Sequence, residues 1–557
     1  MTITALGDSA VVVSLGTGID DSALPRVRAL AEALERVRAP AILDVVPAFS
    51  TVAVFYDPVR LGGFAGKPLE NVKRFINSCA QGEIVGPQGG NPAAGPAGGG
   101  GTAPVVEIPV SYGGDFGPDL EAVAAHAGLS VERAAALHSG ADYRVHAIGF
   151  VPGFPYLAGL PRELAMPRRA SPRAVVPTGS VGIGGAQTGV YPAETPGGWQ
   201  IIGRTPLVLF SQERSPAALL RTGDSVRFRP ISRDEYDRIL MEGVRLQKLT
   251  SATVVNFCNL TPSVPCLNVI KPGLLTTVQD LGRTGYRSAG VPLGGAMDRP
   301  ALRAANRLVG NPEDAAGLEI TLLGPELEFL GDTTIAVCGA EFEGVPAGKS
   351  SLMRSGERLR FGRGIRGCRA YLAVAGGIAV PEVLGSRSTY LRGGFGGYLG
   401  RSLRPGDRLD RHEGKGGRGQ AAKVDRRNGG QLLQPDPFAV VRAVQGAQGA
   451  EFGRALFEAE FKVSPQSDRM GIRLSGPKLE RRAGAELVSG AVVPGTVQVP
   501  PDGQPIVLMA DAQTIGGYPQ AAHVSTADLP ILAQLKPGDS VRFREISLEE
   551  AQSLILA

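Results

Sequence analysis

Two short sequence motifs, which we call words, occur twice in this chain, in the same order, once in each half. The first, Ala-Gln-Thr followed by Tyr-Pro, is centred on Gln187 and again on Gln513. The second, Gly-Asp-Ser-Val-Arg-Phe-Arg, begins at Gly223 and at Gly538, and the spacing from the Gln to the Asp is 37 positions in one half and 26 in the other. A repeat of this kind predicts two related modules that face each other across a pseudo-symmetric cleft. Because concave sites tend to form at domain interfaces, the repeat also indicates where to look for function.

Length and composition narrow the class of protein. The 557 residues are too many for one core, so we expect three or four domains. Glycine (77) and proline (43) are abundant, which favours many turns and short strands over long helices. The net charge of +5 and the single Trp offer neither a concentrated basic face nor a stacking platform, so nucleic-acid binding is not expected.

The cysteines and the N-terminus indicate a cytoplasmic protein. The cysteines are odd in number, far apart and without a Cys-x-x-Cys pair, which argues against a disulfide framework or a zinc cluster. They are Cys79, Cys258, Cys266, Cys338 and Cys368. The first residues show no secretory signal, and no apolar window is long enough to cross a bilayer, so no membrane partner is expected.

Hydrophobic periodicity predicts a mainly β protein with an α/β unit in front. Apolar residues recur at helical spacing from Leu24 to Val37 between strand-like runs, which suits a small α/β sandwich in ββαββα order. Many short β runs punctuated by Gly and Pro follow, a pattern typical of a sandwich or barrel. The expected divisions are an α/β domain at 1–80, a Gly/Pro-rich linker at 81–103, a β-rich unit at 104–247, a link at 248–267, and a second β-rich unit at 268–557 with a basic loop at 411–430.

No common nucleotide-binding word is present. The run Gly-Val-Pro-Ala-Gly-Lys-Ser from Gly344 has three residues between its glycines and contains a Pro, so we interpret it as a turn rather than a P-loop. The five histidines show no metal-ligand spacing. If this protein uses a nucleotide, we expect it to do so without a common mononucleotide fold.

Polar residues within Gly-rich turns are the candidate site residues. Such turns expose backbone N–H groups that suit an oxyanion or a carboxylate. Each acid in them can equally well cap a turn. For Asp298, which directly precedes a predicted helix at 299–308, an N-cap role and a functional role are equally favoured. For Asp511, which follows an apolar strand and lies within the repeat, we favour a functional role.

These words carry a family resemblance that covers almost the whole chain. The first half resembles the KipI and allophanate-hydrolase-subunit-1 family through Pro-Gly-Phe-Pro-Tyr-Leu at 152–157, Gly-Ser-Val-Gly-Ile-Gly-Gly-Ala-Gln-Thr-Gly at 179–189 and Thr-Pro-Gly-Gly-Trp at 195–199. From Val269 onward the chain resembles the KipA and allophanate-hydrolase-subunit-2 family, through Thr-Val-Gln-Asp at 277–280, Gly-Ala-Met-Asp at 295–298 and Asp-Ala-Gln-Thr at 511–514. The Gly/Pro insert, the basic loop and the fusion itself depart from the family pattern.

The resemblance implies tandem cyclophilin-like β-barrel domains preceded by a small α/β domain. It implies a 5-oxoprolinase component that binds 5-oxo-L-proline or a similar lactam or amide and activates it by phosphorylation. ATP with Mg²⁺ would be used, and the ring would open to glutamate with a lactam-utilisation subunit as partner. The pair also resembles the carboxyltransferase portion of urea carboxylase. No Ala-Met-Lys-Met biotinylation word and no amidase signature are found, so covalently attached biotin is not expected. A homo-oligomer is compatible with the sequence.

On this hypothesis the candidate residues take roles in amide activation. Arginines suit bidentate contact with carboxylate or phosphate, and the Gln-Thr pairs would position the planar amide. Asp511 or Asp280 would orient the ring N–H or hold a metal ion, although no metal site is predicted from ligand spacing. The expected catalytic residues are Asp511, Asp280 and Arg469. The expected substrate-binding residues are Gln187, Thr188, Tyr191, Gln513, Thr514, Tyr518, Arg168, Arg283 and Asp298.

Two alternatives stay open from the sequence. One is carboxyl transfer from a separate biotin carrier in the same cleft. The other is regulation, because KipI-like proteins can inhibit a sensor kinase, and that activity should need chiefly the first half.

Overall fold

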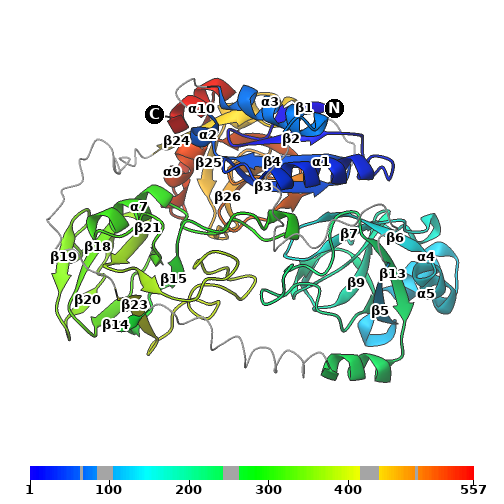
Figure 1. Cartoon of the computed structure of the whole chain (residues 1–557), viewed down its shortest axis with the longest axis horizontal. Helices are drawn as coiled ribbons and strands as arrows, with labels where there is room; N and C mark the ends of the chain where they lie inside the picture. The colour runs from blue at the N-terminus through cyan, green and yellow to red at the C-terminus, as the bar shows by residue number, and fades with distance from the viewer. Residues whose placement is uncertain (63–66, 85–104, 243–261, 414–437, 483–486, 557) are drawn as a thin grey trace.

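The structure is a computed structural model, and it describes residues 1–62, 67–84, 105–242, 262–413, 438–482 and 487–556. It is mainly β, and the predicted barrels in tandem, preceded by a small α/β unit, are confirmed. Figure 1 shows the first barrel on the right, the sheets of residues 263–412 on the left, and the N-terminal unit beside the second barrel at the top. Both chain ends lie in that upper part.

The N-terminal unit is a four-stranded antiparallel sheet covered on one face by helices. Val27 and Leu34 of α1 are buried at the helical spacing that the sequence indicated, and Val72 and Ile76 of α3 are buried in the same core. The other face of the sheet packs against the second barrel, where Asp8 accepts hydrogen bonds from residues 525 and 526. The elements are β1 (Thr2–Ala5), β2 (Ala10–Ser14), α1 (Leu24–Val37), β3 (Ile42–Ala48), β4 (Thr51–Tyr56), α2 (Pro58–Gly62) and α3 (Pro68–Gln81).

The first barrel is a ring of seven strands in the order β6-β13-β5-β12-β9-β10-β7, closed because β7 also pairs with β6. It joins the N-terminal sheet through one pairing, Ala48 opposite Ala147. Its strands are β5 (Val106–Tyr112), β6 (Asp142–Ile148), β7 (Pro155–Ala158), β9 (Ser180–Gly184), β10 (Gln187–Val190), β12 (Gln200–Arg204) and β13 (Ser225–Pro230), with β8 (Arg173–Val176) and β11 (Thr195–Gly197) outside the ring. Helices α4 (Leu120–Ala127) and α5 (Val131–Ser139) pack on it, and residues 233–242 form a helix after it.

Residues 263–412 form two five-stranded antiparallel sheets with a shared apolar core. Helix α7 (Arg299–Leu308) has the bounds that the sequence predicted and packs on one sheet. One sheet contains β14 (Ser263–Lys271), β17 (Glu326–Phe329), β20 (Arg358–Arg360), β22 (Ile378–Ala379) and β23 (Arg408–His412). The other contains β15 (Leu275–Gln279), β16 (Gly317–Thr321), β18 (Thr333–Phe342), β19 (Ser350–Met353) and β21 (Gly364–Val374). The run from Gly344 leads into strand β19 rather than a helix, as expected for a turn.

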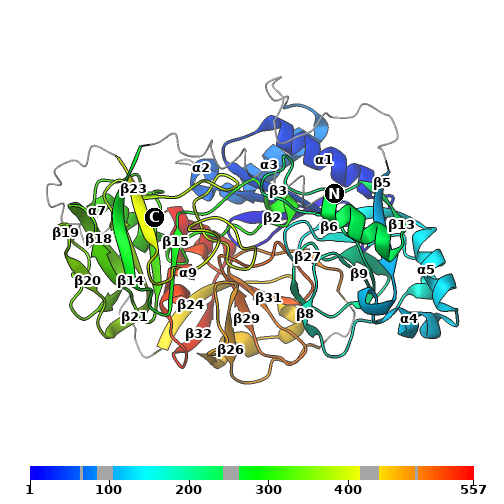
Figure 2. The same cartoon turned by 90° about the horizontal axis from the view of Figure 1, so that it is seen from below.

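The second barrel is again a closed ring of seven strands, in the order β24-β31-β28-β29-β26-β25-β32. These are β24 (Phe438–Gln445), β25 (Glu460–Val463), β26 (Gly471–Ser475), β28 (Thr496–Gln498), β29 (Ile506–Leu508), β31 (Gln520–Val524) and β32 (Ser540–Glu545). Outside the ring lie β27 (Gly490–Ala491), β30 (Ile515–Gly516), α8 (Ala455–Glu458), α9 (Leu529–Gln534) and α10 (Leu548–Leu556). Figure 2 shows this barrel between the first barrel and the sheets of 263–412.

The two barrels share one topology, which accounts for half of the sequence repeat. In each ring the first strand runs parallel to the last: Val226 of β13 lies opposite Val106, and Val541 of β32 lies opposite Ala439. The Gly-Asp-Ser-Val-Arg-Phe-Arg words lead into these equivalent last strands. The Ala-Gln-Thr words are not equivalent, because Gln187 begins strand β10 whereas Gln513 follows strand β29.

The second half therefore divides more finely than the expected single unit at 268–557. Its closed barrel occupies residues 438–545, a length similar to the 106–230 of the first barrel, and the preceding residues build separate sheets. The linker at 85–103 and most of the basic loop, 414–430, lie outside the described residues, whereas the end of the expected link, 263–267, is already strand β14. Among the described residues no disulfide is formed, and none of the helices could span a membrane.

Candidate functional site

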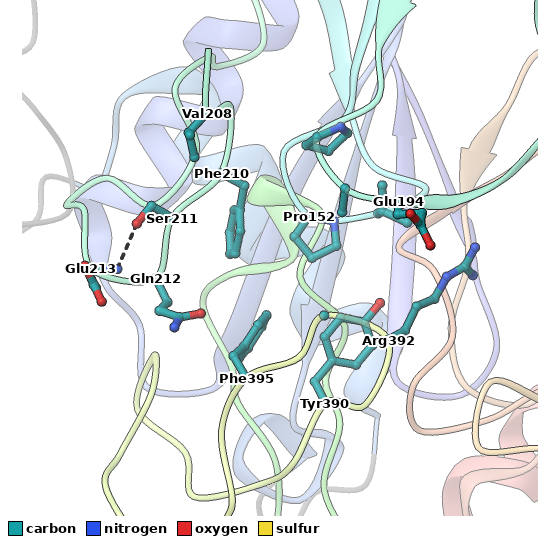
Figure 3. Close-up of a pocket in the computed structure, with 14 residues that line it drawn as sticks. Pro152, Glu194, Val208, Phe210, Ser211, Gln212, Glu213, Tyr390, Arg392 and Phe395 are labelled. Atoms are coloured by element: carbon teal, nitrogen blue, oxygen red, sulfur yellow. Dashed lines mark hydrogen bonds between the residues drawn. The ribbon is translucent and has the colours of Figure 1, made fainter. Parts of the chain in front are cut away.

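A cavity of about 320 Å³ lies where loops of the first barrel meet residues 388–398 of the second half, a segment that we call the Gly-rich loop. Its volume is at the lower end of the range for small-molecule sites. Figure 3 shows side chains from both halves pointing into it. Its lining residues are Val151, Pro152, Pro192, Ala193, Glu194, Val208, Phe210, Ser211, Gln212, Glu213, Tyr390, Arg392, Gly393 and Phe395.

The cavity has an aromatic side and polar ends. Phe210 of the first half and Phe395 of the second lie with ring centroids 6.0 Å apart, and Tyr390 meets Phe395 edge to face at 5.4 Å. Arg392 and Glu194 lie toward one end and Glu213 toward the other (Figure 3). Arg392 is the one cationic side chain among the lining residues, so the cavity combines an aromatic side with a single guanidinium and the two carboxylates of Glu194 and Glu213.

The Gly-rich loop is fixed by Asp280, which sequence reasoning proposed as catalytic. The Asp280 carboxylate accepts hydrogen bonds from the Gly282 backbone N–H (2.8 Å), the Ser386 hydroxyl (2.7 Å) and the Arg387 backbone N–H (2.6 Å). It also accepts a hydrogen bond from the Ser388 hydroxyl. Asp280 is 8% exposed, and its hydrogen bonds hold the segment that leads into the loop.

Arg283 supports the same loop from beneath. Its guanidinium Nη2 donates to the Ser388 carbonyl oxygen at 2.6 Å, and the guanidinium lies 5.2 Å from the centroid of the Phe395 ring. Arg283 is 1% exposed, and its Nε and Nη1 have no hydrogen-bond partner among the described residues. Burial lowers the pKa of Arg283, and the nearby Asp280 and Asp511 partly offset that effect.

A buried ion network lies behind the loop, between the sheets of 263–412 and the second barrel. Arg469 binds both oxygens of Asp511, with Nε at 2.9 Å and Nη2 at 3.0 Å, and also pairs with Glu319. The Tyr371 hydroxyl donates to Glu319 at 2.7 Å, and Arg469 Nη2 donates to the Gly295 carbonyl oxygen at 2.6 Å. The sequence-predicted pair Arg469 and Asp511 is thus brought together, with Glu319 as a member that sequence reasoning missed.

The two carboxylates of the network titrate differently. Burial raises the pKa of Asp511, and Arg469 offsets this only in part. Burial alone would also raise the pKa of Glu319, but Arg469, Arg369 and hydrogen bonds outweigh it and lower that pKa. The Arg469 guanidinium therefore stabilises the charged forms of these two buried carboxylates. The charge of Asp511 also acts to raise the pKa of Arg283 and of Tyr390, which connects the network to the Gly-rich loop.

Asp298 takes the helix-capping role that was one of its two expected roles. Its Oδ1 accepts from the Ala301 backbone N–H at 3.0 Å, as an N-cap of α7 does. Its Oδ2 accepts from Gln534 Nε2 at 2.7 Å, and it is 7% exposed. Asp298 therefore joins α7 to the second barrel and does not line the cavity.

Gln513 and Thr514 line a second, much smaller cavity of about 10 Å³ beside Arg287. This space is about that of one water molecule. Arg287 also pairs with Asp44 of the N-terminal unit, at 3.5 Å between Nε and Oδ2. Burial raises the pKa of Asp44 to about 6, although Arg287 acts to lower it. This position is a polar junction of three parts of the chain.

The Thr of the first-half Ala-Gln-Thr word makes its hydrogen bonds within the first barrel. The Thr188 hydroxyl donates to the Gly182 carbonyl oxygen at 2.9 Å and lies 2.9 Å from His138 Nε2. The other ring nitrogen of His138 lies 2.8 Å from the Tyr112 hydroxyl, and burial lowers the pKa of His138 to about 3. These contacts place Thr188 in the barrel core.

Of the other first-half candidates, Tyr191 and Arg168 lie near an aromatic cluster that includes Trp199. Gln187 is 9% exposed with no hydrogen-bond partner for Nε2 among the described residues. Tyr191 is buried, which raises its pKa to about 12. Arg168 lies on the surface, with its guanidinium 6.0 Å from the Trp199 ring centroid. Tyr518, in the second half, is 47% exposed.

The second Ala-Gln-Thr word leads directly to the first half, although the two words share no cavity. Ile515, the residue after Thr514, packs among aromatic residues of the first half that include Phe154 and Trp199. A Cβ at Gly149 would lie 2.7 Å from the Ile515 side chain, so glycine is needed there for the halves to meet. The second copy of the repeat therefore marks an interface between halves, while the main cavity lies in other loops.

None of the sequence-predicted site residues lines the main cavity; Asp280, Arg283, Arg469 and Asp511 lie behind it. The residues that sequence reasoning missed are Phe210, Tyr390, Arg392, Phe395 and Glu194. The only signal was the alternation of aromatic residues with Gly pairs at 390–398, which a sequence alone does not distinguish from an ordinary turn.

Comparisons with known proteins match both halves. Residues 1–220 match the family model described as carboxyltransferase domain, subdomain C and D, and residues 289–545 match subdomain A and B. The chain is 46% identical over 295 residues to the C-type subunit of 5-oxoprolinase from Escherichia coli, covering 51% of this chain and 93% of that protein. It is 43% identical over 238 residues to the B-type subunit of 5-oxoprolinase from Bacillus subtilis, covering 42% of this chain and 94% of that protein. The solved structure of TTHA0988 is 35% identical, with a TM-score of 0.79, and the match covers 96% of this chain and 99% of that one.

Proposed function

The chain belongs to the carboxyltransferase-domain family that includes the B-type and C-type subunits of 5-oxoprolinase, and we propose that it binds a small lactam for ATP-dependent ring opening. The substrate we propose is 5-oxo-L-proline or a close relative, opened to glutamate with a further subunit. The observation that carries the proposal is a cavity walled by both halves. The first half is similar to the B-type subunit and the second half to the C-type subunit, so the fusion joins both walls in one chain.

The chemistry of the lining suits a cyclic amide that carries a carboxylate. The Phe210 and Phe395 rings offer an apolar wall for ring methylenes. Arg392 supplies the single positive charge for a carboxylate, because its hydrogen bonds among the described residues go to the neutral Thr195 hydroxyl and the Met470 sulfur, and its guanidinium also lies 5.6 Å from the centroid of the Phe150 ring. Gln212 and Tyr390 provide polar groups for an amide. Side-chain polar groups that can fix the orientation of a ligand are a usual part of a small-ligand site.

The cavity does not suit ATP with its Mg²⁺. Phosphoryl transfer needs several cations or N–H donors around the phosphates, whereas one cationic side chain is present here. Within the described ranges no group of three or more His, Cys, Asp or Glu side chains is placed to hold a metal ion. We therefore assign the cavity to the amide and place the phosphoryl donor elsewhere in the complete complex, with a subunit of the lactam-utilisation type.

The ion network supports the site without touching the ligand. The ion pairs of Arg469 with Asp511 and Glu319 join the second barrel to the sheets of 263–412. Arg283 and Asp280 hold the start of the Gly-rich loop by hydrogen bonds. Preorganised groups accelerate reactions because they need no rearrangement when charge develops. On this account these four of the residues that the sequence singled out act by positioning Tyr390, Arg392 and Phe395.

The test is ring opening by the purified chain together with a lactam-utilisation subunit. We expect glutamate and ADP to form from 5-oxo-L-proline and ATP in equal amounts, and only when both proteins are present. Arg392→Gln should reduce this turnover, whereas Arg408→Gln, on a strand outside the cavity, should leave it unchanged. Full turnover by Arg392→Gln, or no turnover by the wild-type pair, would contradict the proposal.

Carboxyl transfer from a separate biotin carrier is the second candidate function. The description of both matching family models as a carboxyltransferase domain favours it. It predicts exchange of labelled carboxylate between a biotinyl carrier and an amide acceptor without ATP hydrolysis. Exchange of this kind, together with an absence of lactam-dependent ADP formation, would select carboxyl transfer over ring opening.

A further inference from the structure

Tyr390 presents an unused hydrogen-bond donor to the main cavity. Its side chain is 2% exposed, it lines the cavity, and its hydroxyl has no hydrogen-bond partner among the described residues. Figure 3 shows Tyr390 between Phe395 and Arg392, with the hydroxyl on the side of the ring that faces Arg392 and Glu194. Buried polar groups normally have a partner, and one that lacks a protein partner at a cavity wall is available to a ligand.

The hydroxyl remains a donor at neutral pH. Burial raises the pKa of Tyr390, and Asp511 raises it further, against the smaller opposing effects of Arg392 and Arg283. The phenol is therefore protonated. A neutral phenol is suited to an oxygen that is partly negative and becomes more so when its carbonyl is attacked or phosphorylated.

The position of Tyr390 is fixed from several sides. Its backbone pairs with Phe395, with Tyr390 N–H to Phe395 carbonyl at 2.9 Å, so that residues 391–394 form a closed turn. The preceding Thr389 donates from both its N–H (3.0 Å) and its hydroxyl (2.9 Å) to the Val278 carbonyl oxygen. A donor held in this way loses little conformational entropy when a ligand binds.

We propose that the Tyr390 hydroxyl donates a hydrogen bond to the carbonyl oxygen of the bound amide, with the amide ring against Phe210 and Phe395. This inference rests on the proposed function and adds the group that recognises the scissile carbonyl. Tyr390 thereby selects ligands with an amide or lactam carbonyl over ring acids of the same shape that lack it. Arg283 and Asp280 act through Tyr390 as positioning residues.

Calorimetric binding of four probes to wild type, Tyr390→Phe and Tyr398→Phe tests the proposal. The probes are 5-oxo-L-proline, 2-pyrrolidinone, urea and cyclopentanecarboxylate, the last of which has a ring and an acid but no amide. Tyr398 belongs to the same loop but packs against the core of the 263–412 sheets, so its variant is the matched control. Tyr390→Phe should weaken binding of an amide probe about fivefold, the effect of one neutral hydrogen bond. Binding of cyclopentanecarboxylate should not change.

Infrared spectra of carbonyl-¹³C-labelled 5-oxo-L-proline give a readout that a general structural defect would not produce. The bound carbonyl band should lie at higher wavenumber in Tyr390→Phe than in wild type and Tyr398→Phe, because one hydrogen bond to the oxygen is lost. Equal affinity and equal band position in Tyr390→Phe and wild type would overturn the inference. So would the failure of every amide probe to bind to wild type. Tyr390-dependent amide binding without ATP-dependent ring opening would refute the proposed function alone.

Discussion

Replacement of Asp280 by Ala should release the Gly-rich loop while leaving both barrels folded. The Asp280 carboxylate is 8% exposed and accepts hydrogen bonds from Gly282, Ser386, Arg387 and Ser388. A hydrogen bond to a charged group contributes about 1.5–3 kcal/mol, but these bonds share one carboxylate and the released donors regain water when the loop opens. We therefore expect local stability to fall by about 3 kcal/mol, well short of the sum.

Hydrogen exchange of the loop amides measures this change directly. A loss of about 3 kcal/mol in local opening free energy corresponds to a roughly 100-fold faster exchange for residues 386–396. Exchange in strands β24 and β32 should stay at the wild-type rate. Asp280→Asn, which keeps the shape of the side chain but turns one acceptor into a donor, should give a smaller increase.

The matched control is Asp332→Ala. Asp332 makes the same kind of contacts, with the Ser355 N–H at 3.0 Å and Arg354 at 2.7 Å, but its side chain is 53% exposed. Water replaces such contacts readily, so the control should change local exchange only slightly. If Asp280→Ala leaves exchange at 386–396 within twofold of wild type, the reasoning that Asp280 positions the cavity loop is refuted.

Three further predictions concern the network, the cavity and pH. Arg469→Met should lower the free energy of unfolding by about 3–5 kcal/mol in denaturant titrations, because it leaves two buried carboxylates without their cation; a loss below about 1 kcal/mol would contradict the network's assigned role. Arg392→Gln should weaken binding of 5-oxo-L-proline about tenfold in calorimetry but hardly affect 2-pyrrolidinone, which has no carboxylate, and equal losses for both would contradict the assignment of Arg392 to the acid. The folded-state pKa of Asp44 is about 6, above the unfolded value of 3.8, so the folded state binds the proton more tightly and stability rises as the pH falls from 7 through 6. Asp44→Asn should lack this rise, about 2–3 kcal/mol between pH 7 and 4, in unfolding free energies measured across that range; an identical rise in the variant would show that another group is responsible.

Local patterns in the sequence were sufficient for many of the elements and singled out members of the buried network, although in another role. The helical spacing from Leu24 and the acid at Asp298 depend on short-range geometry, and α1 and α7 begin where these patterns indicated. Arg469, Asp511, Asp280 and Arg283 were expected to be catalytic or substrate-binding because they lie in or beside Gly-rich turns. In the structure they form a set of buried ion pairs and hydrogen bonds around the loop.

The cavity itself could not be predicted from the sequence. Phe210 and Phe395 are far apart in the chain and meet only because the two halves pack together. Nothing local distinguishes Tyr390 from any aromatic residue in a turn, since its proposed role depends on a hydroxyl that lies where the two halves meet and has no hydrogen-bond partner among the described residues. The Ala-Gln-Thr repeat was informative in a different way than expected, because its two copies occupy different positions in the two barrels and only the second leads to the contact between halves through Ile515.

A crystal structure of the chain with 5-oxo-L-proline would test most directly whether the two halves enclose one amide site. We predict the ligand in the cavity between the first barrel and the Gly-rich loop, with its ring beside Phe210 and Phe395. Its carbonyl oxygen should lie about 2.8 Å from the Tyr390 hydroxyl. An ordered ligand bound at another place, with this cavity left to solvent, would contradict the account.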